Sequence, residues 1–274
     1  MMSDDEEETS VFNMGLGRNK ALDEQVEHPG QNPFRNLPKR FYKEASVEPR
    51  DGGYAVLLDG RGVKTPAKTP LVLPTHALAE AVAEEWNRQG EHIDPRTMWF
   101  TKLANTAIDR VTPRRDAVVD ELAAFSGTDL ICYMADHPVG LAQRQAAHWA
   151  PLIVWAEEAL GASLRVTPGL MHVPQDEATL AAMRAAIEAA SDFELAGLHN
   201  AVTLTGSTVI GLALLHGRLT VDQAFDAAHV DEAWQAYLSG EDEDEAARLA
   251  MRHEELADTA RFLALVRESA ADVA

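Results

Sequence analysis

The sequence is short of cysteine, of aromatic residues and of positive charge. Cys132 is the single cysteine in 274 residues, which excludes a disulfide framework or a cysteine-based zinc site within one chain and is typical of a reducing compartment. Lysine and arginine number 24 against 44 aspartates and glutamates, which gives a formal net charge of -20 at pH 7. Because so acidic a protein repels phosphate backbones, we predict that it does not bind nucleic acid.

Long apolar runs and leader signals are also missing. The longest apolar stretch, 208–215, is much shorter than the ~20 residues that a membrane helix needs. The chain begins MMSDDEEETS, whereas secretory and mitochondrial leaders carry basic residues near the start. We therefore expect a cytoplasmic protein of bacterial type, without membrane insertion.

The common catalytic motifs are absent as well. The sequence contains no GxxxxGKS/T phosphate loop, no HExxH zinc motif and no GxSxG serine motif. Asp226, His229 and Glu232 lie at roughly one-turn intervals on a predicted helix, but a two-metal site needs matching motifs on further helices. A core histidine explains His229 more simply, and a metal-dependent hydrolase built on these three residues is the alternative hypothesis. We predict no catalytic residue, no metal and no cofactor.

The pattern of the chain predicts an α+β fold in two domains after a tail. Residues 1–37 have little apolar periodicity and are expected to be disordered. Residues 38–113 combine short strands, a turn at Asp59-Gly60 and two helices, which predicts a small α+β domain. The remainder, 114–274, is rich in alanine with helical periodicity, which predicts a larger all-α helical-bundle domain.

The predicted helices are bounded by capping and stop signals. In the first domain, Thr75 is placed to cap a helix that ends near Gln89, with Gly90 as its stop, and a second helix fits 97–111. In the second domain we predict helices at 114–125, 141–160, 175–190, 193–204, 207–216, 220–238 and 241–268. Ser207 is expected to cap the helix that follows it rather than to act as a nucleophile.

Two further features, Trp86 and an acidic run, do not form part of any catalytic motif. Trp86 falls on the same helix face as Leu78 and Val82, which predicts a core position. The acidic run Glu241 to Glu245 has two explanations, and both stay open. Carboxylates favour the positive end of a helix dipole, while five in succession repel one another and are typical of an exposed edge that docks basic side chains.

Several short motifs, in this order and spacing, resemble one known family. They are KRFYK at 39–43, LDGR at 58–61, VKTP at 63–66, EW at 85–86 with Gln89, LANTAIDR at 103–110, TDLICY at 128–133, Gln145 with Trp149 and Pro151, Thr167 with Gly169, TGS at 205–207, and AHVDE at 228–232. The chain resembles the assembly chaperones of the F1-ATPase alpha subunit, of the mitochondrial type that alphaproteobacteria also have. One departure is Leu238-Ser239-Gly240, where the family commonly has tryptophan before the glycine.

The resemblance implies a fold and a function. It implies a small α+β domain before a helical domain, binding to the free alpha subunit before that subunit joins beta, and neither catalysis nor cofactor. It points to Glu241, Asp242 and Glu243 as partner-binding residues and to Trp86 as a residue important for the fold. We also expect the chain to be a monomer.

Overall fold

The computed structural model describes residues 37–169, 171–240 and 242–268. The chain divides between Pro113 and Arg114 into two compact units, and each is described here by itself. The predicted tail at 1–37 lies, apart from its last residue, outside the described residues.

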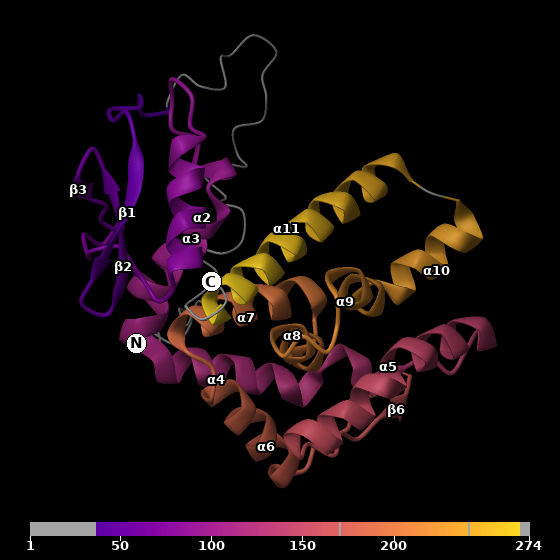
Figure 1. The fold of residues 1–274 in the computed structure, drawn as a ribbon. Coiled ribbons are helices and arrows are strands. Elements are labelled where there is room, and N and C mark those ends of the chain that lie inside the picture. Colours follow the sequence, from indigo (N-terminus) through magenta and orange to yellow (C-terminus); the bar gives the residue numbers. More distant parts are fainter. Residues whose placement is uncertain (1–36, 170, 241, 269–274) are drawn as a thin grey trace, which may run out of the picture. The chain divides into compact units, whose positions relative to one another are not determined.

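The first unit is a small antiparallel sheet covered on one face by helices (Figure 1). Strand β2 (Gly53–Leu58) pairs along its length with β1 (Ala45–Arg50). Its other edge pairs with β3 (Arg61–Gly62) and with β4 (Val72–Leu73). Asp59 and Gly60 both have positive φ, 48° and 78°, so the predicted hairpin turn is confirmed.

Helix α2 (His76–Asn87) packs on β1 and β2, and α3 (Trp99–Thr106) packs on α2. The Thr75 hydroxyl accepts a bond of 3.2 Å from the Leu78 amide, so the predicted cap is confirmed. The prediction of Gly90 as the helix stop is wrong, because α2 ends at Asn87. Its last carbonyls find another donor: the Arg40 guanidinium bonds to the backbone oxygens of Asn87 and Gln89.

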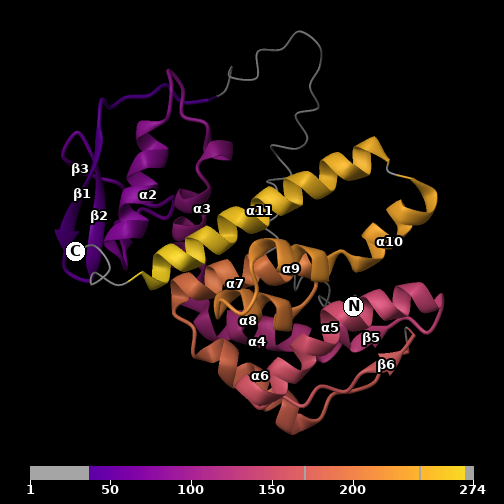
Figure 2. The same cartoon turned by 45° about the vertical axis from the view of Figure 1, so that its right-hand side comes forward.

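The second unit is helical (Figure 2). Its helices are α4 (Arg115–Phe125), α5 (Val139–Leu160), α6 (Glu177–Glu188), α7 (Asp192–Thr205), α8 (Thr208–Leu215), α9 (Val221–Ala228), α10 (Val230–Ser239) and α11 (Glu243–Arg267). Strands β5 (Tyr133–Met134) and β6 (Thr167–Pro168) form one short parallel pair. Every residue of α8 is buried, and α7 and α9 pack on it, so α8 is the centre of the core. The predicted α+β class is confirmed.

One predicted helix, 220–238, is two helices. The chain breaks at His229, whose φ of -119° and ψ of 30° are not helical. Two side chains account for the break: the His229 ring stacks on Phe225 at 4.1 Å, and the Trp149 indole donates to the Ala227 carbonyl at 2.7 Å. Within the described ranges, no helix is both long and apolar enough to cross a membrane.

Candidate functional site

The three residues of the hydrolase hypothesis do not form a metal site. His229 is buried, and its Nδ1 lies 3.0 Å from the Phe225 carbonyl, while Asp226 is exposed to solvent. Burial lowers the pKa of His229 below its usual value, which keeps the ring neutral at pH 7. Across the described ranges, no three His, Cys, Asp or Glu side chains are grouped as a metal ion requires. The simpler explanation of His229 as a core residue is confirmed.

The serine and cysteine candidates also have structural roles. The Ser207 hydroxyl accepts a bond of 3.0 Å from the Ile210 amide, so Ser207 caps α8 as predicted. Cys132 is buried, and burial, with the nearby Asp129 charge, raises the pKa of its thiol to about 12. A thiol that stays protonated is a poor nucleophile.

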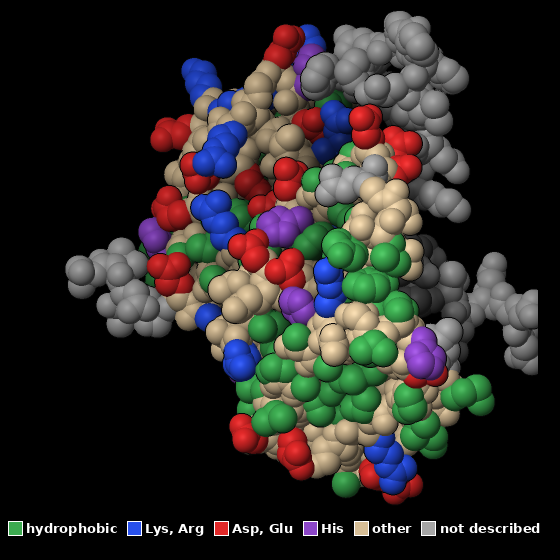
Figure 3. All heavy atoms as spheres, turned by 90° about the vertical axis from the view of Figure 1, so that its right-hand side faces the viewer, with side chains coloured by type: hydrophobic (Ala, Val, Ile, Leu, Met, Phe, Trp, Pro, Cys, Tyr) green, Lys and Arg blue, Asp and Glu red, His purple; other side chains and the backbone are tan. Residues whose placement is uncertain are grey.

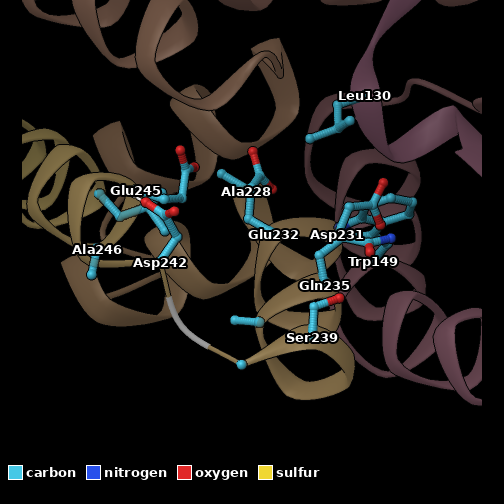
Figure 4. A pocket seen from close by; sticks show the side chains of 13 residues that line it. Leu130, Trp149, Ala228, Asp231, Glu232, Gln235, Ser239, Asp242, Glu245 and Ala246 are labelled. Carbon is cyan, nitrogen blue, oxygen red and sulfur yellow. Dashed lines mark hydrogen bonds between the residues drawn. The ribbon is translucent and has the colours of Figure 1, made fainter.

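A groove opens between α10 and the first half of α11, with α5 at one side (Figure 4). Its volume is about 510 Å³. We call it the α10–α11 groove, and its lining is Leu130, Trp149, Ala228, Asp231, Glu232, Gln235, Ala236, Ser239, Gly240, Asp242, Glu245, Ala246 and Leu249. Small and apolar side chains thus alternate with four carboxylates, an arrangement suited to a partner that is part apolar and part basic.

Helix α10 is fastened to α5 by one hydrogen bond and one close contact. The Gln145 side chain accepts from the Ala135 amide at 2.6 Å and donates to Asp231 at 2.6 Å. Near the start of α5, a Cβ on Gly140 would come within 2.6 Å of the Trp234 ring, so the absence of a side chain there allows the two helices to approach. These contacts fix α10 against α5 and away from α11.

Helix α11 is fastened to other elements. His253 Nε2 lies 2.8 Å from an Asp222 oxygen and the His253 ring packs on Phe225, both on α9, while Arg252 donates to the Leu204 carbonyl at 2.9 Å. The two walls of the groove are therefore held apart by separate anchors, and the connection at Gly240, with φ of 84°, joins them.

The groove walls bury few of their own side chains. Within the described part of the chain, Val230 is the single buried residue of α10, and the first buried residue of α11 is Leu256. The second half of α11 packs in the core through Phe262, Leu263 and Val266. A helix whose inner face meets no core is available for another protein.

Four carboxylates, Asp231, Glu232, Asp242 and Glu245, surround the groove. In Figure 4, Asp242 and Glu245 lie on the α11 side, and Glu232 lies on the α10 side. Asp231 and Asp242 are exposed, and the other two are half-buried. Of the four, Glu245 alone forms an ion pair among the described residues, with Arg248 at 2.5 Å. The groove therefore presents excess negative charge.

The predicted partner-binding residues fall at this groove in part. Asp242 lines it and caps α11, where its Oδ1 accepts from the amides of Asp244 and Glu245 at 3.0 and 3.1 Å. Glu243 is exposed in the first turn of α11 and is not part of the lining. Glu241 lies outside the described residues. Asp242 therefore has the role at the helix start that one explanation of the acidic run gave it. The explanation as a docking edge stays a prediction, and Asp242 and Glu245 of the run line the groove.

Trp86 lies in the first unit and is half-buried, so the prediction of a full core position holds only for its inner part. Its ring packs edge-on against Tyr42 at 5.6 Å, and the Tyr42 hydroxyl donates to the Trp86 carbonyl at 2.7 Å. The side chain that is deeply buried is its neighbour Glu85, with 7% exposed.

Glu85 belongs to a set of polar side chains that tie the first unit together, here called the polar frame: Arg40, Glu85, Asn87, Gln89 and Asp109. The Glu85 carboxylate accepts from the amides of Phe100 and Thr101 and from the Thr101 hydroxyl at 2.7 to 2.8 Å. It thereby caps α3 from a distant part of the chain. These five residues lie within the motifs or beside them, which explains the motifs of the first unit as structural.

Some of these roles leave no signal in the sequence. Glu85 and Gln145 belong to the family motifs, but their partners Phe100 and Asp231 lie 15 and 86 residues away. Leu249, Ala236 and Ala246 line the groove and carry no sequence signal other than small or apolar character on exposed helices. The acidic run was the one available signal for this region.

Exposed hydrophobic side chains also lie outside the groove. Val139 and Val154 of α5 and Tyr237 and Leu238 of α10 are at least half exposed. Arg144 lies over the Tyr237 ring, 4.8 Å from its centroid. Figure 3 shows hydrophobic side chains gathered over the lower part of the face it draws. Apolar surface of this kind is typical of proteins that contact other proteins.

An acidic groove and exposed apolar surface are features typical of proteins that bind other proteins. A family model described as ATP12 chaperone protein matches residues 39–157. A crystal structure of Atp12 from Paracoccus denitrificans is 44% identical, with a TM-score of 0.81 over 84% of this chain and 98% of that one; a mutant of the same protein matches equally. The chain belongs to the ATP12 chaperone family.

Two further relatives extend the comparison. A chaperone candidate from Agrobacterium tumefaciens is 37% identical, with a TM-score of 0.81 over 90% of this chain and 96% of that one. Protein atp12, mitochondrial, from Schizosaccharomyces pombe is 24% identical over 218 residues, which is 75% of each chain. Of these two, the Agrobacterium protein carries the word chaperone in its description.

Proposed function

We propose that this protein binds the unassembled alpha subunit of F1-ATPase and holds it until it joins the beta subunit, thereby promoting assembly of the ATP synthase. The observation that carries the proposal is the 44% identity to Atp12 over most of both chains. The role has a physical basis. A subunit that has not yet met its partner exposes an apolar interface, which aggregates unless it is covered.

The binding site in this proposal is the acidic start of α11, with Asp242 and Glu243 and with Glu241 beside them. Carboxylates at an exposed edge steer a basic partner and set its orientation, and they add less to the affinity itself. Release is then compatible with binding, because a partner held partly by screened charges dissociates readily when a better interface arrives. The protein acts without catalysis and without a cofactor.

Co-purification tests the proposal. A tagged form of the whole protein, expressed in cells that make F1, is expected to retain the alpha subunit and not the assembled F1. The control is the tag on an unrelated acidic protein, because a net charge of -20 attracts basic proteins in general. If alpha is absent from the retained material while F1 is being made, the proposal is wrong.

Charge reversal tests the acidic edge. Glu243 is exposed and makes no capping bond, so the double variant Glu241→Lys with Glu243→Lys should fold like the parent and lose alpha binding. Asp242 is left in place because it caps α11. The matched control is Glu254→Lys, an exposed residue further along the same helix and outside the groove. Full retention of alpha by the double variant would remove the edge from the site.

A further inference from the structure

We infer that the α10–α11 groove receives an amphipathic helix of the client, with its apolar side chains on the groove floor and its lysines or arginines at the carboxylates. This inference rests on the proposed function for the client's identity. The shape, lining and charge of the groove support it.

The residues that line the groove favour apolar side chains on the partner. Leu249 and Leu130 are half-buried and provide apolar surface, with the buried Trp149 beneath, and Ala228, Ala236 and Ala246 leave room above it. A groove of about 510 Å³ floored in this way takes several apolar side chains. Alanines at the walls allow close approach of a partner's backbone, as small residues do between packed helices.

The backbone of the groove walls favours a helical segment over an extended one. Both walls are helices, whose own amides and carbonyls are bonded within them except at the ends. An extended peptide would therefore find no strand edge to pair with and would leave its backbone groups unbonded. A helix satisfies its backbone internally and needs only side-chain contacts, so the groove suits a helical segment.

The negative charge of the groove favours a segment that carries positive charge. Asp231 is bonded to Gln145 and Asp242 to the start of α11, and neither has a cation partner within the described ranges. Both are exposed, so pairing them with a lysine or arginine removes little water from them. The apolar contacts then supply affinity, and the carboxylates supply orientation and choice of partner.

The experiment uses the full-length protein and a synthetic probe, a helical peptide of about 20 residues with leucines on one face and lysines on the other. Binding is followed by fluorescence anisotropy. The central pair of variants is Ala246→Trp and Ala247→Trp. Both positions are exposed neighbours on α11, but only Ala246 lines the groove. Filling the groove should weaken peptide binding by about tenfold or more, and the control should stay within about twofold.

A second pair tests the charge. Glu232→Gln removes a carboxylate that lines the groove, and Glu254→Gln removes one that does not. The first should weaken binding several-fold at low salt, and the difference should shrink as salt is raised to about 0.5 M, where charges are screened. A peptide with glutamates in place of the lysines should bind much more weakly than the lysine peptide.

The outcomes separate this inference from the proposed function. Equal binding of the peptide to Ala246→Trp and Ala247→Trp means that it binds by general charge attraction, and the inference is overturned even if alpha co-purifies. Selective loss in Ala246→Trp supports the groove. The same pair is then tested with isolated alpha subunit, and loss of alpha binding in Ala246→Trp alone identifies the client helix as the groove's occupant. If alpha binds both variants equally, it docks elsewhere and the inference fails while the proposed function stands.

Discussion

The polar frame of the first unit and the α10–α11 groove of the second use acidic side chains in opposite ways. In the frame, the Glu85 carboxylate is buried and accepts three hydrogen bonds, two of them from backbone amides. In the groove, Asp231 and Glu232 face a cavity, and the helix that carries them buries only Val230 among its described residues. Similar residues thus serve internal bonding in one region and an open surface in the other.

This difference predicts which substitutions affect which property. A buried carboxylate leaves unbonded donors behind when it is removed, so its loss appears in the free energy of unfolding. A solvated carboxylate leaves nothing unbonded, so its loss appears in binding. Changes in the frame should therefore lower stability. Changes at a groove carboxylate that makes no hydrogen bond among the described residues, such as Glu232, should lower partner binding at nearly constant stability.

The largest effect is expected for Glu85→Ala. It leaves the amides of Phe100 and Thr101 and the Thr101 hydroxyl without their acceptor and removes the cap of α3. We expect a loss of about 3 kcal/mol in the free energy of unfolding, measured by urea denaturation. The control is Glu84→Ala, the exposed neighbour whose carboxylate pairs with Arg88, with an expected loss below about 0.5 kcal/mol. Similar losses in both variants would abolish the contrast between frame and surface.

A buried carboxylate in the helical unit extends the comparison. Asp129 accepts from the Val209 and Ile131 amides at 3.0 and 3.3 Å, and burial raises its pKa from 3.8 to about 6 despite these bonds. Between those two pH values the folded protein binds more protons at this site than the unfolded chain does. The stability that Asp129 contributes is therefore present at low pH and falls by about 3 kcal/mol as the pH rises through this window.

The variant Asp129→Asn removes this titration. Its stability relative to the parent should rise by about 3 kcal/mol between about pH 4 and pH 7 in paired denaturation curves. Two histidines have the opposite dependence. Burial lowers the pKa of His229, and partial desolvation at the surface lowers that of His216, so they destabilise the fold as the pH falls. They are the same in both proteins and cancel in the difference. A difference that does not change with pH would show that Asp129 is ionised throughout.

Features that depend on neighbouring residues could be predicted from the sequence. Local signals gave correct results: Thr75 and Ser207 cap the helices they were expected to cap, and the Asp59-Gly60 turn forms. Capping and turns depend on neighbours within a few residues, so the pattern alone contains the answer. The α+β class followed from the same local periodicity.

Features that depend on hydrogen bonds between distant parts of the chain could not be predicted from the sequence. The end of α2 depends on Arg40, 47 residues before Asn87, and the break at His229 depends on Trp149, 78 residues before Ala227. The acidic run was visible, but the groove beside it was not, because its walls are set by anchors to α5 and α9 that no short window contains. The sequence thus predicts the cluster of acidic residues but not the groove beside it.

A medium effect is expected for Trp86→Ala. The ring is half-buried and packs on Tyr42, so its removal should lower the free energy of unfolding by roughly 2 kcal/mol, less than for a fully buried tryptophan. Trp86 Nε1 is buried and has no hydrogen-bond partner within the described part of the chain. Trp86→Phe keeps the apolar contact and removes this unbonded group, so it should stay within about 1 kcal/mol of the parent. If Trp86→Phe is as unstable as Trp86→Ala, the contact depends on the part of the indole ring that phenylalanine lacks.

The smallest effect on stability is expected at Asp242, where capping and docking meet in one side chain. Asp242→Asn keeps an oxygen for the amides of Asp244 and Glu245 and removes the charge at the groove. Because asparagine caps about as well as aspartate, stability should change by less than about 0.5 kcal/mol, whereas Asp242→Ala should lose about 1 kcal/mol. Binding of the alpha subunit should weaken in both variants alike, since both lose the charge. Measured together, unfolding and alpha binding separate the two roles: if Asp242→Asn binds alpha as the parent does and only Asp242→Ala is impaired, the carboxylate acts solely as a cap and the groove's charge at this position has no part in docking.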